Sequence, residues 1–76
     1  MKSSNNILIT GSSGFIGSAV LKELYKNKDN NFFLLKRKNS SMRRIEQLIN
    51  SKRITTFYYD ELKYLFKNHT IDFVVH

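Results

Sequence analysis

The sequence predicts an α/β fold with a doubly wound parallel sheet. Short apolar and β-branched stretches alternate with segments whose apolar residues recur at three and four positions, the spacing of an amphipathic helix. A glycine-containing turn joins the first stretch directly to the first helical segment. Strands that alternate with helices form parallel sheets with right-handed crossovers, so we expect β-α-β-α-β-α-β along the chain. The fourth strand should cross to the far side of the first, which gives the spatial order 3-2-1-4.

The first strand and the first helix are the most clearly marked elements. Residues 6–10 (NILIT) are mostly apolar and β-branched, and they end at Gly11, which is typical of a buried parallel strand. A helix is then expected from Phe15 to about Lys26. Its apolar stripe consists of Phe15, Ile16, Ala19, Val20 and Leu24. The polar segment 26–31 separates this helix from the next strand as a turn.

The rest of the chain continues the alternation of strand and helix. The expected elements are a strand at 32–35, a helix that begins with capping side chains at 39–41 and carries the stripe Met42, Ile45, Leu48 and Ile49, a strand at 53–59, a short helix at 61–68 and a strand at 71–75. No repeat, low-complexity tract or linker interrupts them, so residues 1–76 form one unit. The first two helices should cover one face of the sheet and the third helix the other.

The composition limits the classes of function. With 76 residues, 41% of them hydrophobic and 25% charged, the chain has room for one modest core. The absence of cysteine excludes disulfides, thiolate zinc sites and a cysteine nucleophile, and two histidines make a poor metal site. The amino end MKSSNN leads into an apolar stretch too short for a signal peptide or a membrane span. We therefore expect a cytoplasmic protein with no metal and no membrane partner.

A cluster of positive charge follows the second strand. The net charge is +7, and five basic side chains fall within nine residues: Lys36, Arg37, Lys38, Arg43 and Arg44. Three explanations are open: a solvated basic face, a site for a small phosphate group, and a nucleic-acid surface. Aromatic residues that stack on bases are missing from this stretch, which makes nucleic acid the least favoured of the three.

All three glycines stand at intervals of three between the first strand and the first helix. The N–H groups of a first helical turn lack partners and the helix dipole is positive there, so such a loop is a seat for an anion. Gly11 would allow a tight turn, Gly14 would leave room for a pyrophosphate, and Gly17 would let the helix lie close to the sheet. Ser12 and Ser13 add hydroxyl donors. The setting between strand and helix favours a dinucleotide fingerprint over a plain turn, and the pattern excludes a P-loop.

These residues resemble a known family. The segment Thr10–Gly17 (TGSSGFIG) is similar to the TGxxGFIG signature of the extended short-chain dehydrogenase/reductases, the NAD-dependent epimerase/dehydratase family. The last residues, IDFVVH at 71–76, are similar to the fourth-strand pattern that leads into a cofactor loop in that family. The resemblance covers essentially the whole chain. It implies the amino-terminal part of a Rossmann-type NAD(P)-binding domain, incomplete and without its substrate domain, and it places Phe15 and Ile16 with the glycines and serines at the cofactor.

The end of the second strand bears on the choice of cofactor. An acidic residue about 20 residues after the glycines would bind an adenosine ribose 2′-hydroxyl, and none is present. Lys36, Arg37 and Ser40 stand there instead, and cations suit the dianionic 2′-phosphate of NADP(H). The resemblance implies the same, because NADP-dependent members carry a basic residue and a serine here. We expect NADP(H) in preference to NAD(H), with Arg37 as the main contact and solvated charge as the alternative.

No catalytic residue is expected in this segment. The resemblance implies a Tyr-x-x-x-Lys pair on a helix after the fifth strand, with the tyrosine as acid/base. Tyr59 and Lys63 match that spacing, but Tyr59 follows the third strand, on the adenosine side of the fold, so we interpret the match as accidental. Asp60 resembles the family aspartate beside the adenine, and a helix N-cap is an equal alternative.

The expected function follows from the resemblance. The parent enzyme would bind a dinucleotide and transfer hydride at a carbon of a nucleotide sugar, in epimerisation, dehydration or reduction, whereas the 76-residue chain alone is expected to be inactive. The alternatives are a non-enzymatic nucleotide-sensing or interaction module and, less favoured, a basic nucleic-acid-binding domain. The strand at 71–75 would expose an apolar edge. This edge predicts self-association and indicates a piece truncated from a longer enzyme.

Overall fold

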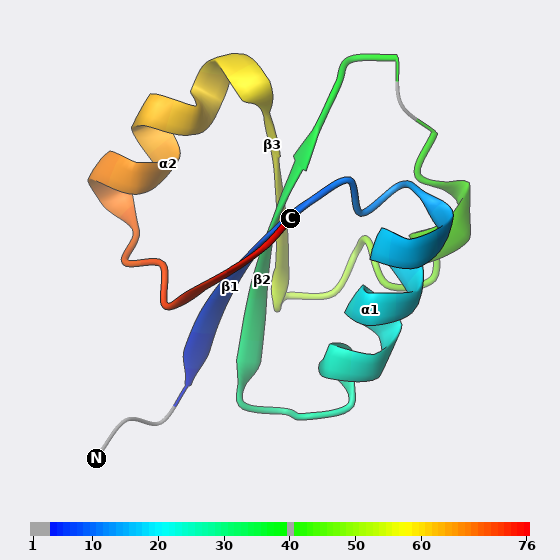
Figure 1. The fold of residues 1–76 in the computed structure, drawn as a ribbon. Coiled ribbons are helices and arrows are strands. Elements are labelled where there is room, and N and C mark those ends of the chain that lie inside the picture. The colour runs from blue at the N-terminus through cyan, green and yellow to red at the C-terminus, as the bar shows by residue number, and fades with distance from the viewer. Residues whose placement is uncertain (1–3, 40) are drawn as a thin grey trace.

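The computed structural model describes residues 4–39 and 41–76 and, within them, a parallel sheet of four strands. The strands are β1 (Asn5–Thr10), β2 (Asn30–Lys36), β3 (Ile54–Tyr58) and β4 (Phe73–Val75). The helices are α1 (Phe15–Tyr25) and α2 (Leu62–Asn68), with 3₁₀ turns η1 (Arg43–Ile45) and η2 (Tyr59–Glu61). Figure 1 shows α1 and α2 on opposite sides of the sheet. The predicted α/β class and the strand order 3-2-1-4 are confirmed.

The parallel pairing of the strands brings their carboxyl ends to one edge of the sheet. β1 pairs with β2 over its whole length, from Asn5 opposite Asn30 to Thr10 opposite Leu35. On its other side β1 pairs with β4, beginning with Ile7 opposite Phe73. All pairs, including β2 with β3, are parallel. The carboxyl ends of the strands therefore meet at the same edge, which is where ligands bind in open α/β sheets.

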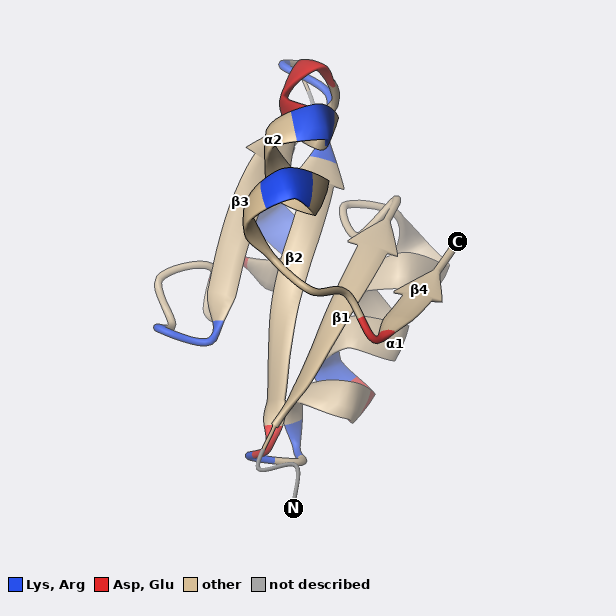
Figure 2. Ribbon diagram, turned by 90° about the vertical axis from the view of Figure 1, so that its left-hand side faces the viewer, with Lys and Arg blue, Asp and Glu red and all other residues tan. Residues whose placement is uncertain are grey.

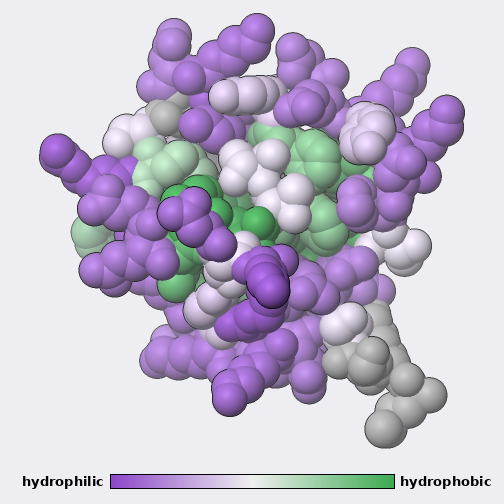
Figure 3. All heavy atoms as spheres, turned by 180° about the vertical axis from the view of Figure 1, so that it is seen from behind, coloured by the Kyte–Doolittle hydropathy of each residue, from purple (hydrophilic) through white to green (hydrophobic). Residues whose placement is uncertain are grey.

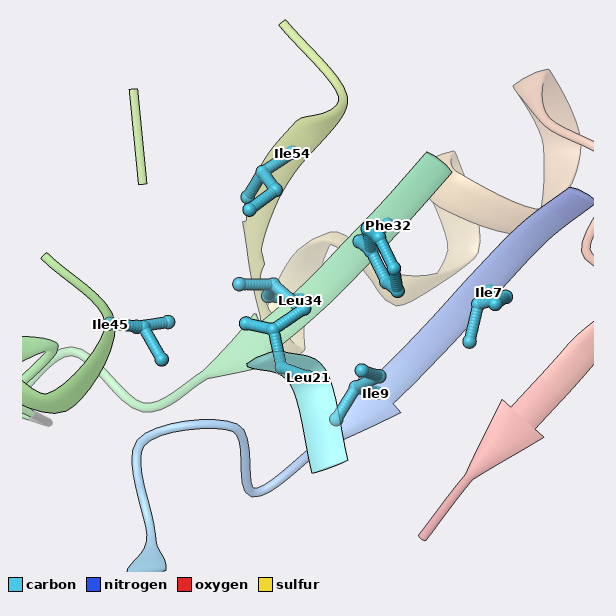
Figure 4. Packing of buried hydrophobic residues seen from close by; sticks show 7 residues of the cluster. All are labelled: Ile7, Ile9, Leu21, Phe32, Leu34, Ile45 and Ile54. Atoms are coloured by element: carbon cyan, nitrogen blue, oxygen red, sulfur yellow. The ribbon is translucent and has the colours of Figure 1, made fainter. Parts of the chain in front are cut away.

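Buried side chains form a core on each face of the sheet. The first cluster lies under α1 and η1 (Figure 4), and its members are Ile7, Ile9, Leu21, Phe32, Leu34, Ile45 and Ile54. The second cluster lies under α2, and its members are Leu8, Phe33, Leu35, Phe57 and Leu65. Leu21 of α1 and Leu65 of α2 are both 0% exposed, so each helix is anchored by a fully buried leucine. Burial on both faces explains why β1 and β2 are continuous apolar runs.

The predicted second α-helix is wrong. The segment forms η1 and then a series of turns at 46–50. Ile45 is 1% exposed, and the rest of the predicted stripe packs at the margin of the first cluster. The stripe begins with intervals of three, at Met42, Ile45 and Leu48, which also match the three residues per turn of a 3₁₀ helix. The spacing therefore predicted correctly which side chains pack toward the core, although the segment is not an α-helix.

The predicted core face of α1 also needs correction. Phe15 and Ile16 are 76% and 77% exposed, because the first turn of α1 stands at the carboxyl edge, where the sheet no longer covers it. The buried residues of α1 are instead Ser18 and Leu21. β4 is shorter than expected and begins at Phe73.

A cation–aromatic contact closes the opposite, amino edge of the sheet. The Arg53 guanidinium lies 3.9 Å from the ring centroid of Tyr25 and donates to the main-chain oxygens of Tyr25, Asn27 and Asn30. The Tyr25 hydroxyl donates to Ser51 Oγ at 2.6 Å. The Ser51 hydrogen bond lowers the pKa of Tyr25, burial opposes this shift, and Arg53 adds to it. The end of α1 is thereby fixed to the starts of β2 and β3.

The two edges of the sheet differ in polarity. Seen from the β3 side, most of the surface is hydrophilic and surrounds a smaller apolar centre (Figure 3). β4 forms the other edge, and its Phe73 and Val74 are each 58% exposed. The predicted exposure of apolar side chains on the fourth strand is confirmed, and self-association through it stays a prediction.

Candidate functional site

The candidate site lies at the carboxyl edge of the sheet, where three segments meet. β1 runs into the glycine-rich loop, residues 11–14; β2 ends at Lys36 and is followed by Arg37; and β3 continues into η2. Figure 2 shows basic and acidic residues gathered at this end of β2 and β3. Because β1 and β2 are neighbours in the sheet, the glycines and the basic residues lie at adjacent strand ends.

Gly11 and Gly14 give the loop its shape. Gly11 has a φ of +69°, a backbone conformation that strongly favours glycine. The Gly14 N–H donates to the Gly11 carbonyl at 3.0 Å, and the Ser18 N–H donates to the Gly14 carbonyl at 3.0 Å. Gly14 is the N-cap of α1, and no side chain caps this helix. Main-chain N–H groups at the start of α1 therefore keep their capacity to bind an anion.

Gly17 allows α1 and the loop to approach closely. A Cβ built on Gly17 would overlap the carbonyl oxygen of Gly11 and lie 2.8 Å from its carbonyl carbon. A Cβ on Gly14 would meet the same oxygen at 3.3 Å. The close approach predicted for Gly17 is thus to the loop itself. Together the glycines keep a cradle of main chain free of side chains, which is what a diphosphate group requires.

A hollow of about 310 Å³, here called the phosphate hollow, joins the loop to the end of β2. Its lining consists of Gly11, Ser13, Gly14, Leu35, Lys36, Arg37 and Tyr59. Predicted site residues from two separate elements therefore border one space. With a helix start on one side and two cations on the other, the residues present suit a phosphate-bearing ligand.

A second hollow of about 210 Å³ continues from the basic strand end toward η2. Its lining consists of Lys36, Arg37, Lys38, Tyr58, Tyr59 and Asp60. Asp60 is exposed in η2, and the N-cap of α2 is Glu61, so the N-cap interpretation of Asp60 is wrong. Glu61 instead accepts a hydrogen bond from the Tyr58 N–H at 2.8 Å. Ser40, which the sequence predicts as a contact of the 2′-phosphate, lies outside the described residues.

A third hollow of about 460 Å³ opens between the ends of β1 and β4. Its lining consists of Thr10, Gly11, Ile16, Gly17, Val20, Tyr59, Val75 and His76. Thr10 Oγ1 lies 2.8 Å from Nδ1 of His76 across this opening. Strand order reverses between β1 and β4, and that switch point is a general ligand site in doubly wound sheets. The predicted cofactor residues Ile16 and Gly17 thus border the space that continues from the phosphate hollow.

The two serines of the loop occupy different places. Ser13 lines the phosphate hollow. Ser12 is 0% exposed, and its Oγ has no hydrogen-bond partner among the described residues. A buried hydroxyl without a partner is costly. Ser12 borders none of the three hollows, so its contact with a phosphate group stays a prediction. Phe15, in contrast, is exposed and borders none of the three hollows.

Sequence reasoning missed three contacts at this edge. Tyr59 lines all three hollows, although the sequence singles it out only through its spacing with Lys63, a match that we interpret as accidental. Arg44 donates from Nη1 to the Ser13 carbonyl at 3.2 Å. The contact of Thr10 with His76 is the third. The available signal for Tyr59 was its place after a strand, whereas the other two contacts join elements that no local pattern relates.

The comparison with protein families agrees with this geometry. The model of the NAD dependent epimerase/dehydratase family matches residues 7–76. The chain belongs to this family. Membership implies an NAD(P)-binding Rossmann segment, in agreement with the glycine cradle and the cations at its side.

A solved structure supports the same fold. The chain is similar to a thiolation-reductase di-domain from an archaeal non-ribosomal peptide synthetase, with a TM-score of 0.72 and 25% sequence identity. The alignment covers 92% of this chain and 24% of that chain, so the present sequence spans a minor part of the length of its structural neighbour. The comparison with curated proteins gave no significant match.

Neither a metal cluster nor a membrane span is found in residues 4–39 and 41–76. In this part of the chain no three side chains of the metal-ligating types His, Asp and Glu come together as a possible site. None of its helices has the length and apolar character needed to cross a bilayer.

Proposed function

We propose that this chain binds NADP(H), in preference to NAD(H), along the carboxyl edge of its sheet. The phosphate hollow carries the proposal, because it unites the glycine-rich loop with Lys36 and Arg37. The loop and the start of α1 would receive the diphosphate, and Arg37 with Lys36 would bind the 2′-phosphate. The lining of this hollow contains no carboxylate to accept a hydrogen bond from a ribose 2′-hydroxyl.

The second hollow is the proposed place of the adenosine. Asp60 offers an acceptor for an amino group, and the exposed Tyr59 ring offers a flat apolar wall. Ser40 would add a hydroxyl beside the 2′-phosphate. The nicotinamide of the bound cofactor supplies or accepts hydride, and the residues of this chain hold and orient the other half of the molecule.

We further propose that the chain is the amino-terminal part of a nucleotide-sugar epimerase, dehydratase or reductase of the cytoplasm. The family match supports hydride chemistry, and the structural neighbour is itself described as a reductase di-domain. The Tyr-x-x-x-Lys pair expected from the resemblance would follow a fifth strand, and the described residues 4–39 and 41–76 form four strands. Tyr59 and Lys63 belong to η2 and α2, so we propose that the chain alone has no turnover.

Calorimetric titration tests the cofactor proposal. The folded chain is titrated with NADP⁺ and with NAD⁺, and so are Arg37→Ala and the control Lys28→Ala. Both substitutions remove one positive charge from an exposed position, but Lys28 lies in the turn between α1 and β2, at the amino edge. A hydrogen bond to a charged group contributes about 1.5–3 kcal/mol, so R37A should weaken NADP⁺ binding about 10-fold or more and leave NAD⁺ unchanged.

Three results would contradict the proposal in different ways. Equal affinity of the wild-type chain for NAD⁺ and NADP⁺ would remove the cofactor preference. Equal loss of NADP⁺ affinity in R37A and K28A would show that net charge, and not Arg37, is responsible. A folded chain that binds neither dinucleotide but binds an oligonucleotide with steep salt dependence would favour the nucleic-acid alternative.

A further inference from the structure

Arg44 reaches the glycine-rich loop from a distant part of the chain. Its Nη1 donates to the carbonyl oxygen of Ser13 at 3.2 Å, across 31 positions of sequence. Ser13 is the loop residue that follows the buried Ser12, and its own surface lines the phosphate hollow. Arg44 therefore contacts the loop beside the place where the proposed diphosphate would lie.

The 3₁₀ geometry of η1 explains why this side chain faces the loop. Three residues complete one turn of a 3₁₀ helix, so Arg43, Arg44 and Ile45 point in three different directions. Ile45 is 1% exposed and is fixed in the core beside Leu21 of α1. With Ile45 anchored, Arg44 lies toward the loop and donates to the Ser13 carbonyl. Arg43 is exposed, as is Arg44. An α-helix in this segment, as the sequence predicts, would have placed these side chains differently.

The hydrogen bond to the Ser13 carbonyl restrains the conformation of the loop. It belongs to the same peptide unit as the Gly14 N–H, which donates to the Gly11 carbonyl. A donor that holds the carbonyl at one end of this rigid unit also fixes the direction of the N–H at the other end. Arg44 thus restrains the turn that sets the distance between Gly11 and the start of α1.

The positive charge of Arg44 also favours a bound anion at the loop. The positive end of the α1 dipole lies at Gly14, and the first turn of α1 contains no acidic residue. A guanidinium placed nearby adds to this positive potential. The cost of bringing a cation to such a site is relieved when an anion binds, so the arrangement favours a phosphate-bearing ligand over the empty state.

We propose that Arg44 is a positioning residue for the dinucleotide: it holds the Ser13 peptide so that the glycine-rich loop keeps the form in which it receives a diphosphate. The inference rests on the proposed function. It differs from the role of Arg37, because the loop serves the diphosphate common to NADP(H), NAD(H) and ADP. Loss of Arg44 should therefore weaken all three ligands, whereas loss of Arg37 should weaken NADP(H) alone.

Glycine-selective ¹⁵N labelling gives a direct test. The three glycines of the chain all lie in the loop or in the first turn of α1, so a labelled amide spectrum reports on this region alone. Arg44→Met removes the donors and the charge, Arg44→Lys keeps the charge and a donor, and Arg43→Met is the matched control with the same change of net charge. ADP is the probe for affinity, since it carries a diphosphate and no 2′-phosphate.

The proposal predicts a specific pattern. R44M should shift the Gly14 amide signal and weaken ADP binding about 10-fold, R44K should restore part of the affinity, and R43M should change neither signal nor affinity. An unchanged Gly14 signal in R44M, or an equal loss of affinity in R43M, would overturn the proposal. If the folded wild-type chain binds neither ADP nor NADP⁺, the proposed function fails, and the Gly14 signal still decides whether Arg44 holds the loop.

Discussion

Substitution of Gly17 by alanine tests the packing of α1 on the loop. The added Cβ would overlap the Gly11 carbonyl oxygen and lie 2.8 Å from its carbon, and both atoms are main chain that cannot rotate away. Overpacking of this kind costs about 1–3 kcal/mol, and the upper part of that range applies where rigid backbone is the obstacle. Alanine regains about 0.5–1 kcal/mol through its better helix propensity. We expect G17A to lose about 1–2 kcal/mol of unfolding free energy.

Urea denaturation followed by circular dichroism measures this loss. Gly14→Ala is the graded comparison, because its Cβ would meet the same oxygen at 3.3 Å, a contact that a small movement relieves. G14A should therefore be less destabilised than G17A. In a domain of this size each kcal/mol corresponds to about 4–8 °C in the melting temperature. A G17A chain as stable as wild type, or a G14A chain that loses more than G17A, would refute the steric argument.

Two further predictions concern regions outside the glycine-rich loop. Because Ser51 and Arg53 lower the pKa of folded Tyr25, the native state releases this phenolic proton before the unfolded state does, so stability should rise with pH in the alkaline range between the two pKa values. Urea unfolding at several alkaline pH values should show this rise in the Tyr64→Phe control and not in Tyr25→Phe. At the apolar edge, Val74→Lys on β4 should reduce self-association in sedimentation experiments. Thr55→Lys on the opposite edge strand adds the same charge, and an equal effect there would contradict a role for β4.

The sheet could be predicted because its signals are local. Continuous apolar runs mark β1 and β2, and their burial on both faces is what such runs require. The glycine spacing likewise predicts the turn at Gly11, where φ is +69°. The failure at the second helix has a physical reason, since intervals of three serve a 3₁₀ turn as well as an α-helix. Phe15 and Ile16 fit a helical stripe but lie beyond the sheet that would have covered them.

The candidate site could be predicted only in part. The loop and the basic strand end were each visible in the sequence, and parallel topology places them side by side. The contact of Arg44 with Ser13 depends on a segment whose conformation the sequence does not specify. Tyr59 borders three hollows from its place at the start of η2, directly after β3, which no periodicity indicates. The tertiary contacts of single exposed side chains are thus the part of the site that the sequence predicts least well.

The central claim is that a dinucleotide binds on the glycine-rich loop, and an NADP⁺ titration of the glycine-labelled chain tests it most directly. Gly11 and Gly14 line the proposed diphosphate position, and Gly17 packs against Gly11, so the three amide signals should shift together and saturate with one dissociation constant, equal to the calorimetric value. Glycine signals that stay in place while calorimetry records binding would show that the ligand lies elsewhere. Signals that stay in place without any binding, in a chain that circular dichroism shows to be folded, would contradict the cofactor site itself.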